Sequence, residues 1–333
     1  MNSPSPTEPL IAIKDLKKWY PVRKGFLSRA KSEFVHAVDG VTLDIRKGEA
    51  LSLVGESGCG KTTLARLMLR LVDPTEGTIT LRGQDLLTAN KREMHRIRTQ
   101  MQAVFQDPYA SLDPKQTILQ IVSEPLTVNK LDKKHSDTLD RVTAALTAVG
   151  LNPPKSFLGK FPYELSGGQR QRVALARAIV IKPSLIVADE PVSMLDVSIR
   201  AEILGLMLKL KRELNLTYLF ITHDLAVARY ISDRMAVMYL GRVVEIGPAE
   251  EVCSNPVHPY TKALLLALPT TDPRKRSVEI GIKGEVPSPV NIPAGCRFKP
   301  RCPYAFEKCP VEPELLRAGN HHYAACYLAE SPS

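Results

Sequence analysis

The chain has 333 residues, of which 44% are hydrophobic and 24% are charged, so it can bury a full core and form two domains. No segment approaches the roughly 20 apolar residues of a membrane helix, and the first ten residues lack the basic and apolar regions of a secretion signal, so we expect a cytoplasmic protein. The net charge of +10 is compatible with nucleic acid or an anionic membrane as partner, but its even spread favours a solvated surface with a phosphate-binding pocket.

In chain order, the sequence predicts a short N-terminal segment, a layered α/β domain and a C-terminal part of different composition. Residues 1–9 are rich in Pro and Ser and are expected to be disordered. From about residue 10 to 250, short β-type runs alternate with helical stretches, and a helical insertion covers about 114–178. The expected elements are strands at 50–54, 185–188 and 218–221, a helix at 61–71, and a hairpin formed by 235–240 and 243–246.

The last part of the chain, residues 251–333, differs in amino-acid composition. Twelve of the 26 prolines lie in the final 85 residues, which predicts a second, loop-rich unit. Four of the six cysteines also lie there. In a reducing cytosol, such a cluster favours a metal site over disulfides.

The segment Gly55-Glu-Ser-Gly-Cys-Gly-Lys-Thr62 follows a predicted strand and opens a predicted helix, as a phosphate loop requires. Its glycines let the backbone N–H groups surround phosphate oxygens, and the helix directs its positive end at the same anion. Lys61 is expected to neutralise the β- and γ-phosphates of ATP, and Thr62 to bind Mg²⁺.

Two carboxylates end the apolar run Ser184–Glu190 (SLIVADE) downstream of this loop. Asp189 is placed to hold Mg²⁺ through a water molecule, and Glu190 to polarise the water that attacks the γ-phosphate. The combination of a phosphate loop with these carboxylates predicts an enzyme that hydrolyses Mg·ATP.

The string Leu165-Ser-Gly-Gly-Gln169 narrows the class further, because here the sequence resembles the ATP-binding-cassette (ABC) ATPases over about residues 10–250. The resemblance implies a phosphate-loop core with a parallel central sheet, an antiparallel β subdomain and a helical insertion. It also implies a head-to-tail dimer in which the LSGGQ segment of one subunit closes over ATP held by the other.

The same resemblance assigns roles to residues outside the phosphate loop. It places Gln106 in the Q-loop, Ser193–Asp196 in the D-loop with Met194 where Ala is commoner, and His223 as the γ-phosphate contact. The expected ATP-binding residues are Tyr20, Gly55, Glu56, Ser57, Gly58, Cys59, Gly60, Lys61, Thr62, Thr63 and Gln106, with Tyr20 stacking on adenine. The catalytic residues are Glu190 and His223; Thr62, Gln106 and Asp189 hold Mg²⁺; and Ser166, Gly167, Gly168, Gln169 and Asp196 contact the partner's ATP.

The segments 255–265, 284–289 and 295–303 resemble the tail of the ATPases that drive dipeptide and oligopeptide importers, within a match of about 253–328. This implies one of two unlike ATPase subunits, docked beneath two permeases at the cytoplasmic face of the bacterial inner membrane. An extracytoplasmic binding protein would deliver the peptide, and nucleic acid is not an expected partner. Two alternatives stay open: an importer of nickel or another solute, and a soluble ABC ATPase acting on nucleic acid or the ribosome.

Cys296, Cys302, Cys309 and Cys326 lack the tight C-x2-C spacing of structural zinc sites. Some peptide-importer ATPases carry an iron–sulfur cluster in this tail, so the resemblance predicts a [4Fe–4S] cluster on these four thiolates, with nearby basic residues to offset its charge. Zinc and free thiols are the alternatives.

Overall fold

The computed structural model describes residues 8–22, 33–132, 134–267 and 284–330. The chain divides into two compact units. Unit 1 comprises Arg46–Glu49 and Thr88–Phe220 among the described residues, and unit 2 comprises Glu8–Ile45, Ala50–Leu87 and Ile221–Ser333. Residues 1–7 of the expected disordered end lie outside the described residues, and the first strand begins at Pro9.

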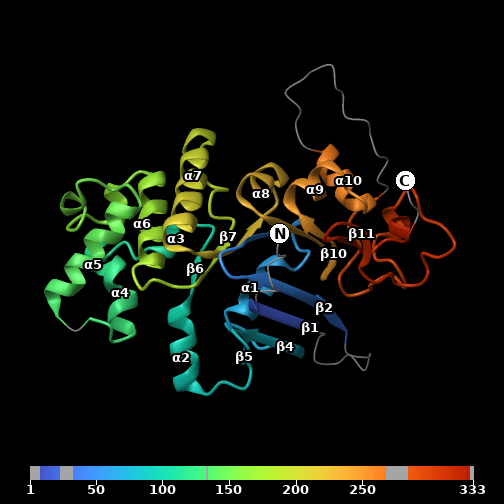
Figure 1. Cartoon of the computed structure of the whole chain (residues 1–333), viewed down its shortest axis with the longest axis horizontal. Helices are drawn as coiled ribbons and strands as arrows, with labels where there is room; N and C mark the ends of the chain where they lie inside the picture. Colours follow the sequence, from blue (N-terminus) through green and yellow to red (C-terminus); the bar gives the residue numbers. More distant parts are fainter. Residues whose placement is uncertain (1–7, 23–32, 133, 268–283, 331–333) are drawn as a thin grey trace, which may run out of the picture. The chain divides into compact units, whose positions relative to one another are not determined.

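Unit 1 contains the helices that follow the antiparallel subdomain in sequence (Figure 1). Its elements are α2 (Lys91–Gln100), β6 (Met101–Val104), α3 (Pro108–Ser111), α4 (Ile118–Val128), α5 (His135–Ala148), η1 (Pro154–Ser156), η2 (Pro162–Glu164), α6 (Gly167–Ile179), β7 (Leu185–Asp189), α7 (Val197–Leu214) and most of β8 (Thr217–Thr222). Helices α4, α5 and α6 pack together, so the expected helical insertion is present. Strands β6 and β7 pair in parallel, and β8 is the next neighbour of β7.

Unit 2 holds the antiparallel subdomain, whose strand order is β2-β1-β4-β5. These strands are β1 (Pro9–Pro21), β2 (Phe34–Arg46), β4 (Glu76–Leu81) and β5 (Gln84–Asp85). Strand β1 pairs antiparallel with β4, which pairs antiparallel with β5. The antiparallel β subdomain implied by the resemblance is therefore confirmed, and Figure 1 shows its strands side by side.

A second group of strands in unit 2 has the order β11-β12-β10-β9-β3. The remaining elements of this unit are β3 (Ala50–Val54), α1 (Lys61–Met68), α8 (Leu225–Ile231), β9 (Arg234–Tyr239), β10 (Arg242–Pro248), α9 (Ala249–Ser254), α10 (Pro259–Leu266), η3 (Lys299–Arg301), β11 (Leu316–Gly319), β12 (His322–Ala324) and η4 (Tyr327–Glu330). Strand β3 is parallel to β9, and β9 and β10 form the expected hairpin.

The tail adds strands to this sheet, which the sequence did not indicate. Strand β12 pairs antiparallel with β10, and β11 pairs with β12. The buried Glu245 of β10 fixes the pairing, because its carboxylate accepts hydrogen bonds from the backbone N–H groups of Val257 (2.8 Å) and His258 (3.0 Å) and lies 2.7 Å from Nε2 of His322. Three partners satisfy an otherwise costly buried charge. The described residues of the tail, 251–267 and 284–330, therefore pack within the compact unit that also holds the phosphate loop.

No helix in the described ranges combines the length and the apolar character needed to cross a bilayer.

Candidate functional site

The predicted site residues are distributed over both units. Tyr20, residues 55–63 and His223 belong to unit 2, whereas Gln106, residues 166–169, Asp189, Glu190 and Asp196 belong to unit 1.

The phosphate loop connects the fully buried strand β3 to helix α1 as predicted. Three of its residues adopt positive φ, namely Gly55 (152°), Gly58 (79°) and Gly60 (108°), which caps the helix in the left-handed conformation. These are angles that side chains other than glycine rarely adopt. The loop is thus shaped to expose backbone N–H groups at the start of the helix, the arrangement that binds phosphate.

The loop also leaves no space for side chains at two of these glycines. A Cβ atom on Gly55 would lie 2.2 Å from the carbonyl oxygen of Met238 in β9, and a Cβ on Gly60 would lie 2.0 Å from that of Ala37 in β2. By contrast, a Cβ on Gly58 would meet no atom within 4 Å. Close backbone contact, rather than conformation alone, therefore requires glycine at positions 55 and 60.

Lys61 lies beneath the loop and is only 6% exposed. Its Nζ donates to the carbonyl oxygens of Gly55 (2.7 Å) and Glu56 (2.8 Å), so the ammonium group is held against the loop backbone. Thr62, the expected Mg²⁺ ligand, is exposed in the first turn of α1. A hydroxyl beside a phosphate cradle suits Mg²⁺, which binds oxygen donors and substrate phosphates.

Tyr20 and Trp19 occupy different environments at the end of β1. The indole Nε1 of Trp19 donates to Asp39 (2.8 Å), and its ring packs 4.7 Å from that of His36. The ring of Tyr20 is 36% exposed, with Nζ of Lys18 5.1 Å from its centroid. Trp19 is therefore engaged within the subdomain, whereas Tyr20 presents a ring surface on which a base can stack.

Asp39 connects this region to the tail. Burial pushes its pKa upward, but hydrogen bonds from Arg297 and Trp19 hold the pKa below its ordinary value. The carboxylate is therefore ionised at neutral pH and orders the end of β1.

Asp189 is the last residue of β7 and Glu190 follows it, both in unit 1. Glu190 has a φ of 48°, a strained conformation for a residue other than glycine. The Nε2 amide of Gln106 donates to Oε2 of Glu190 (3.1 Å), and Ser193 donates through its hydroxyl to the Glu190 carbonyl (3.0 Å). The structure thus brings Gln106 and Glu190 together. The hydrogen bond orients the Glu190 carboxylate, and Glu190 is partly exposed to solvent.

The LSGGQ segment forms the start of α6. The hydroxyl of Ser166 accepts a hydrogen bond from the Gln169 N–H (3.3 Å), and the Gln169 side chain accepts one from the Ser166 N–H (3.1 Å), which makes a capping box. Ser166 is thus the N-cap residue, and the helix starts at Gly167. A Cβ on Gly168 would lie 2.7 Å from a methyl of Ile199 in α7, which explains the need for glycine there.

Asp196 and His223 both lie at helix entrances. Asp196 is the exposed N-cap residue of α7, and the neighbouring Met194 and Val197 are 59% and 80% exposed. His223 is exposed directly after β8, next to Asp224, which caps α8. Both side chains are therefore placed where a ligand or a partner chain can reach them.

The prediction of a [4Fe–4S] cluster is wrong. Among the residues that the structure describes, no group of three or more His, Cys, Asp or Glu side chains could hold a metal ion, which also removes support for zinc. Cys296 and Cys302 pack against the apolar cluster of unit 2. Burial raises the pKa values of Cys296 and Cys302, and that of Cys326 to about 11.

Comparison with known proteins agrees with this geometry. A family model described as "ABC transporter" matches residues 38–193, and one described as "Oligopeptide/dipeptide transporter, C-terminal region" matches residues 244–309. Neither description is of an iron–sulfur protein. Among solved structures, a dimeric ATP-binding cassette, MJ0796 bound to ADP and Pi, is 30% identical with a TM-score of 0.61, covering 72% of this chain and 98% of that one. The cassette cbiO1 of Clostridium perfringens is 26% identical with a TM-score of 0.63, covering 74% and 91%.

The fold, the phosphate loop and the LSGGQ helix define an ABC-type ATPase. Three curated relatives identify the branch. The oligopeptide transport ATP-binding protein AppF of Bacillus subtilis is 48% identical over 96% of this chain and 98% of its own length. The oligopeptide transport ATP-binding protein OppF of Salmonella typhimurium is 45% identical and covers 95% of each chain. The dipeptide transport ATP-binding protein DppF of Haemophilus influenzae is 45% identical and covers 98% of each chain. The chain belongs to the family of ATP-binding subunits of oligopeptide and dipeptide ABC transporters, which couple ATP hydrolysis to transport.

The contact at Gly60 generates a stability prediction with an internal control. Gly60→Ala forces a methyl group into the Ala37 carbonyl and should lower the free energy of unfolding by roughly 2–4 kcal/mol. Gly58→Ala adds a methyl group in open space and should cost only about 1 kcal/mol, from its positive φ. Urea unfolding of both full-length variants without nucleotide measures the difference, and equal losses would contradict the close-contact explanation.

Proposed function

We propose that this chain is the ATPase subunit of a bacterial importer of dipeptides or oligopeptides and acts at the cytoplasmic face of the membrane. The observation that carries the proposal is the near-complete match to peptide-transport ATPases, including the importer-type tail at residues 244–309. This match favours a peptide over nickel as the transported solute. It also favours transport over action on nucleic acid or the ribosome.

In the proposed reaction the loop N–H groups and Lys61 bind the β- and γ-phosphates, and the ring of Tyr20 stacks on adenine. Mg²⁺, held by Thr62, Gln106 and, through water, Asp189, would neutralise charge on the phosphates. Glu190 takes the proton of a water molecule whose oxygen attacks the γ-phosphorus, and ADP leaves. The hydrogen bond from Gln106 aims the Glu190 carboxylate, and His223 contacts the γ-phosphate.

The complete site is proposed to need a second, homologous ATPase subunit. Ser166 and the following glycine amides form a helix start that can bind a γ-phosphate, as the phosphate loop does. The exposed apolar side chains of Met194 and Val197 flank Asp196 and suit burial against a partner chain. The dimeric cassette with bound ADP and Pi among the similar structures supports a dimer of cassettes.

A groove in unit 1 is proposed to receive a cytoplasmic segment of a permease. This cavity of about 280 Å³ lies between the end of β6, α4 and α6. Phe105 and Val128 expose 47% and 62% of their surface there, and the ion pair between Arg177 and Glu124 (2.5 Å) supplies a polar wall. An apolar, polar-edged groove beside the Gln106 segment fits a helix that reports ATP binding to the membrane.

Replacing Glu190 by Gln tests its role as the general base. Glu190→Gln keeps the size and the acceptor for Gln106 but cannot take a proton, so ATPase turnover of the assembled transporter should fall by roughly 10²-fold or more while ATP still binds. Glu202→Gln, which alters an exposed carboxylate paired with Arg172, is the control and should keep normal turnover. Near wild-type hydrolysis by Glu190→Gln would refute the assignment if the partner's composite site is inactivated in the same way.

If the ATP site is composite, a substitution at Ser166 should affect ATPase turnover of the complex but not ATP binding by the isolated chain. Ser166→Arg should leave the ATP affinity of the isolated chain unchanged, since the chain's own phosphate loop is intact, but should lower turnover of the full complex by ~10²-fold through misplacement of the partner's ATP. Ser166→Ala removes the hydroxyl, with the helix cap (about 1 kcal/mol of stability) and its contact with the partner's ATP, but adds no bulk, so the further loss in Ser166→Arg measures the steric block. Loss of ATP binding by isolated Ser166→Arg would contradict the model.

Co-purification from detergent-solubilised membranes tests the partners. The tagged chain should recover a second ATPase subunit and two permeases, and Val128→Asp should lower permease recovery by about tenfold because a charge enters the apolar groove. Leu214→Asp, at the end of α7 outside the groove lining, should have no effect. Equal permease recovery with both variants would rule out docking at this groove.

A further inference from the structure

Two residues of the tail of unit 2 contact the phosphate loop at Glu56. The backbone N–H of Glu56 donates to the hydroxyl of Tyr260 (2.8 Å), and its carboxylate forms an ion pair with Arg301. Position 56 is variable in the phosphate-loop pattern, so the pattern gives no reason for these contacts. Both tail residues lie more than 200 positions away in the sequence.

Arg301 contacts the Glu56 carboxylate in a directional, two-point geometry rather than as a simple point charge. Its two terminal nitrogens donate to the two carboxylate oxygens of Glu56, at 3.0 and 3.3 Å. The residue is only 8% exposed, and its guanidinium lies 5.8 Å from the ring centroids of both Tyr239 and Phe298. A planar, two-point contact of this kind fixes the direction of the carboxylate as well as its distance.

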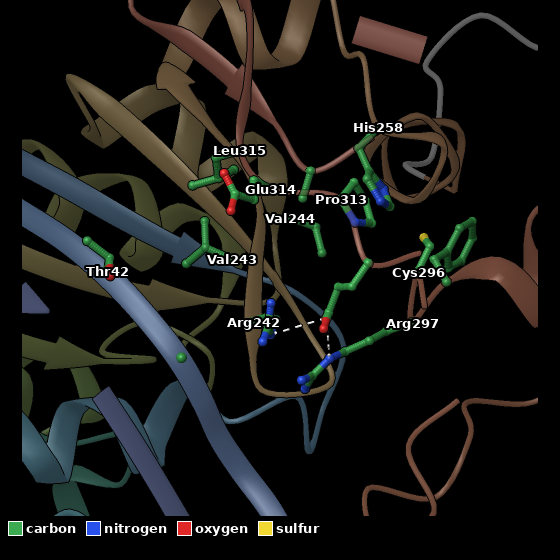
Figure 2. Close-up of a pocket in the computed structure, with 14 residues that line it drawn as sticks. Thr42, Arg242, Val243, Val244, His258, Cys296, Arg297, Pro313, Glu314 and Leu315 are labelled. Carbon is green, nitrogen blue, oxygen red and sulfur yellow. Dashed lines mark hydrogen bonds and ion pairs between the residues drawn. The ribbon is translucent and has the colours of Figure 1, made fainter. Parts of the chain in front are cut away.

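The turn that carries Arg301, residues 296–302, is itself anchored. Three successive backbone hydrogen bonds close it, from Lys299, Arg301 and Cys302. Arg242 and Arg297, both labelled in Figure 2, form ion pairs of 3.2 and 3.1 Å with Glu312, and Arg297 also binds Asp39. Arg301 therefore projects from a fixed turn, and its position does not depend on Glu56 alone.

Tyr260 is equally fixed on its own helix. It is fully buried, and its ring packs 4.6 Å from that of Tyr239 and 5.5 Å from that of Phe298. Its N–H donates to Nδ1 of His258 (3.1 Å), the cap of α10. Burial lowers the pKa of His258 to about 4, so this ring nitrogen stays an acceptor at neutral pH.

Glu56 transmits these contacts to the lysine of the loop. Its carbonyl oxygen accepts hydrogen bonds from Nζ of Lys61 (2.8 Å) and from the Cys59 N–H (3.3 Å). One residue is thus held by the tail at its N–H and carboxylate while it holds Lys61 at its carbonyl. A displacement of Glu56 must change where the ammonium group lies relative to a bound phosphate.

We propose that Tyr260 and Arg301 are positioning residues of the nucleotide site, through which the C-terminal tail sets the affinity of the phosphate loop for ATP. This rests on the proposed role of residues 55–62 as the phosphate loop. Neither residue touches nucleotide; each acts through Glu56. The tail thereby contributes to nucleotide binding in addition to any contact it makes with other subunits.

The test is MgATP affinity of the full-length chain by calorimetric titration. Tyr260→Phe deletes one hydroxyl and keeps the packed ring, and Arg301→Ala deletes the ion pair; each should weaken MgATP binding by roughly five- to tenfold. Arg301→Lys, which keeps the charge but not the two-point contact, should recover part of the loss. The matched controls Tyr323→Phe and Arg317→Ala alter tail residues that do not contact the loop and should bind normally.

A double-mutant cycle separates positioning from a purely structural role. Because Arg301 acts through the Glu56 carboxylate, Arg301→Ala should add little further loss of affinity in a Glu56→Ala background. Unchanged MgATP affinity in Tyr260→Phe and Arg301→Ala would overturn the proposal, as would full additivity with Glu56→Ala or a fall in melting temperature alone. Lys61→Ala tests the underlying assignment separately: if it binds MgATP normally, the phosphate-loop role fails first.

Discussion

The absence of space between the phosphate loop and the two strands beside it is the constraint on which the nucleotide site depends. Gly55 and Gly60 bring the loop backbone against carbonyl groups of β9 and β2, where even a methyl group would overlap. The N–H of Gly241, in the β9–β10 turn, adds a hydrogen bond to the Cys59 carbonyl (2.9 Å). The far end of the loop is therefore held by close backbone contacts and by this hydrogen bond, whereas the Glu56 end is held by side chains of the tail. This explains why the contacts with the tail converge on Glu56.

The buried carboxylate of Glu245 joins the tail to the same strands. A carboxyl group that is wholly removed from water needs hydrogen-bond partners, and here they come from two separate parts of the tail, around His258 and at His322. The segments that carry Tyr260 and Arg301 are consequently built onto β10. A loop-rich sequence gains a defined shape from this attachment.

Local features of the site could be predicted from the sequence, and non-local ones could not. The phosphate loop, the acidic end of β7 and the capped start of α6 each depend on a few adjacent residues whose types dictate the backbone, so their patterns identify them. The pairing of β12 with β10 and the contact of Arg301 with Glu56 join residues that no periodicity connects. The cysteines show the opposite error. Their number and clustering in the sequence indicated metal binding, but sequence position carries no information about side-chain arrangement, and the described residues form no group of three or more that could hold a metal ion.

The late position of β12 also bears on synthesis of the protein. Strand β10 ends at Pro248, but its neighbour on the open side is supplied by residues 322–324. At the usual rate of translation, several seconds or more separate the two on the ribosome. During that interval β10 exposes an unpaired edge and Glu245 lacks His322, a state that invites pairing with other chains. A nascent or truncated chain of this protein is therefore a natural substrate for chaperones and proteases until residues 322–324 have left the ribosome.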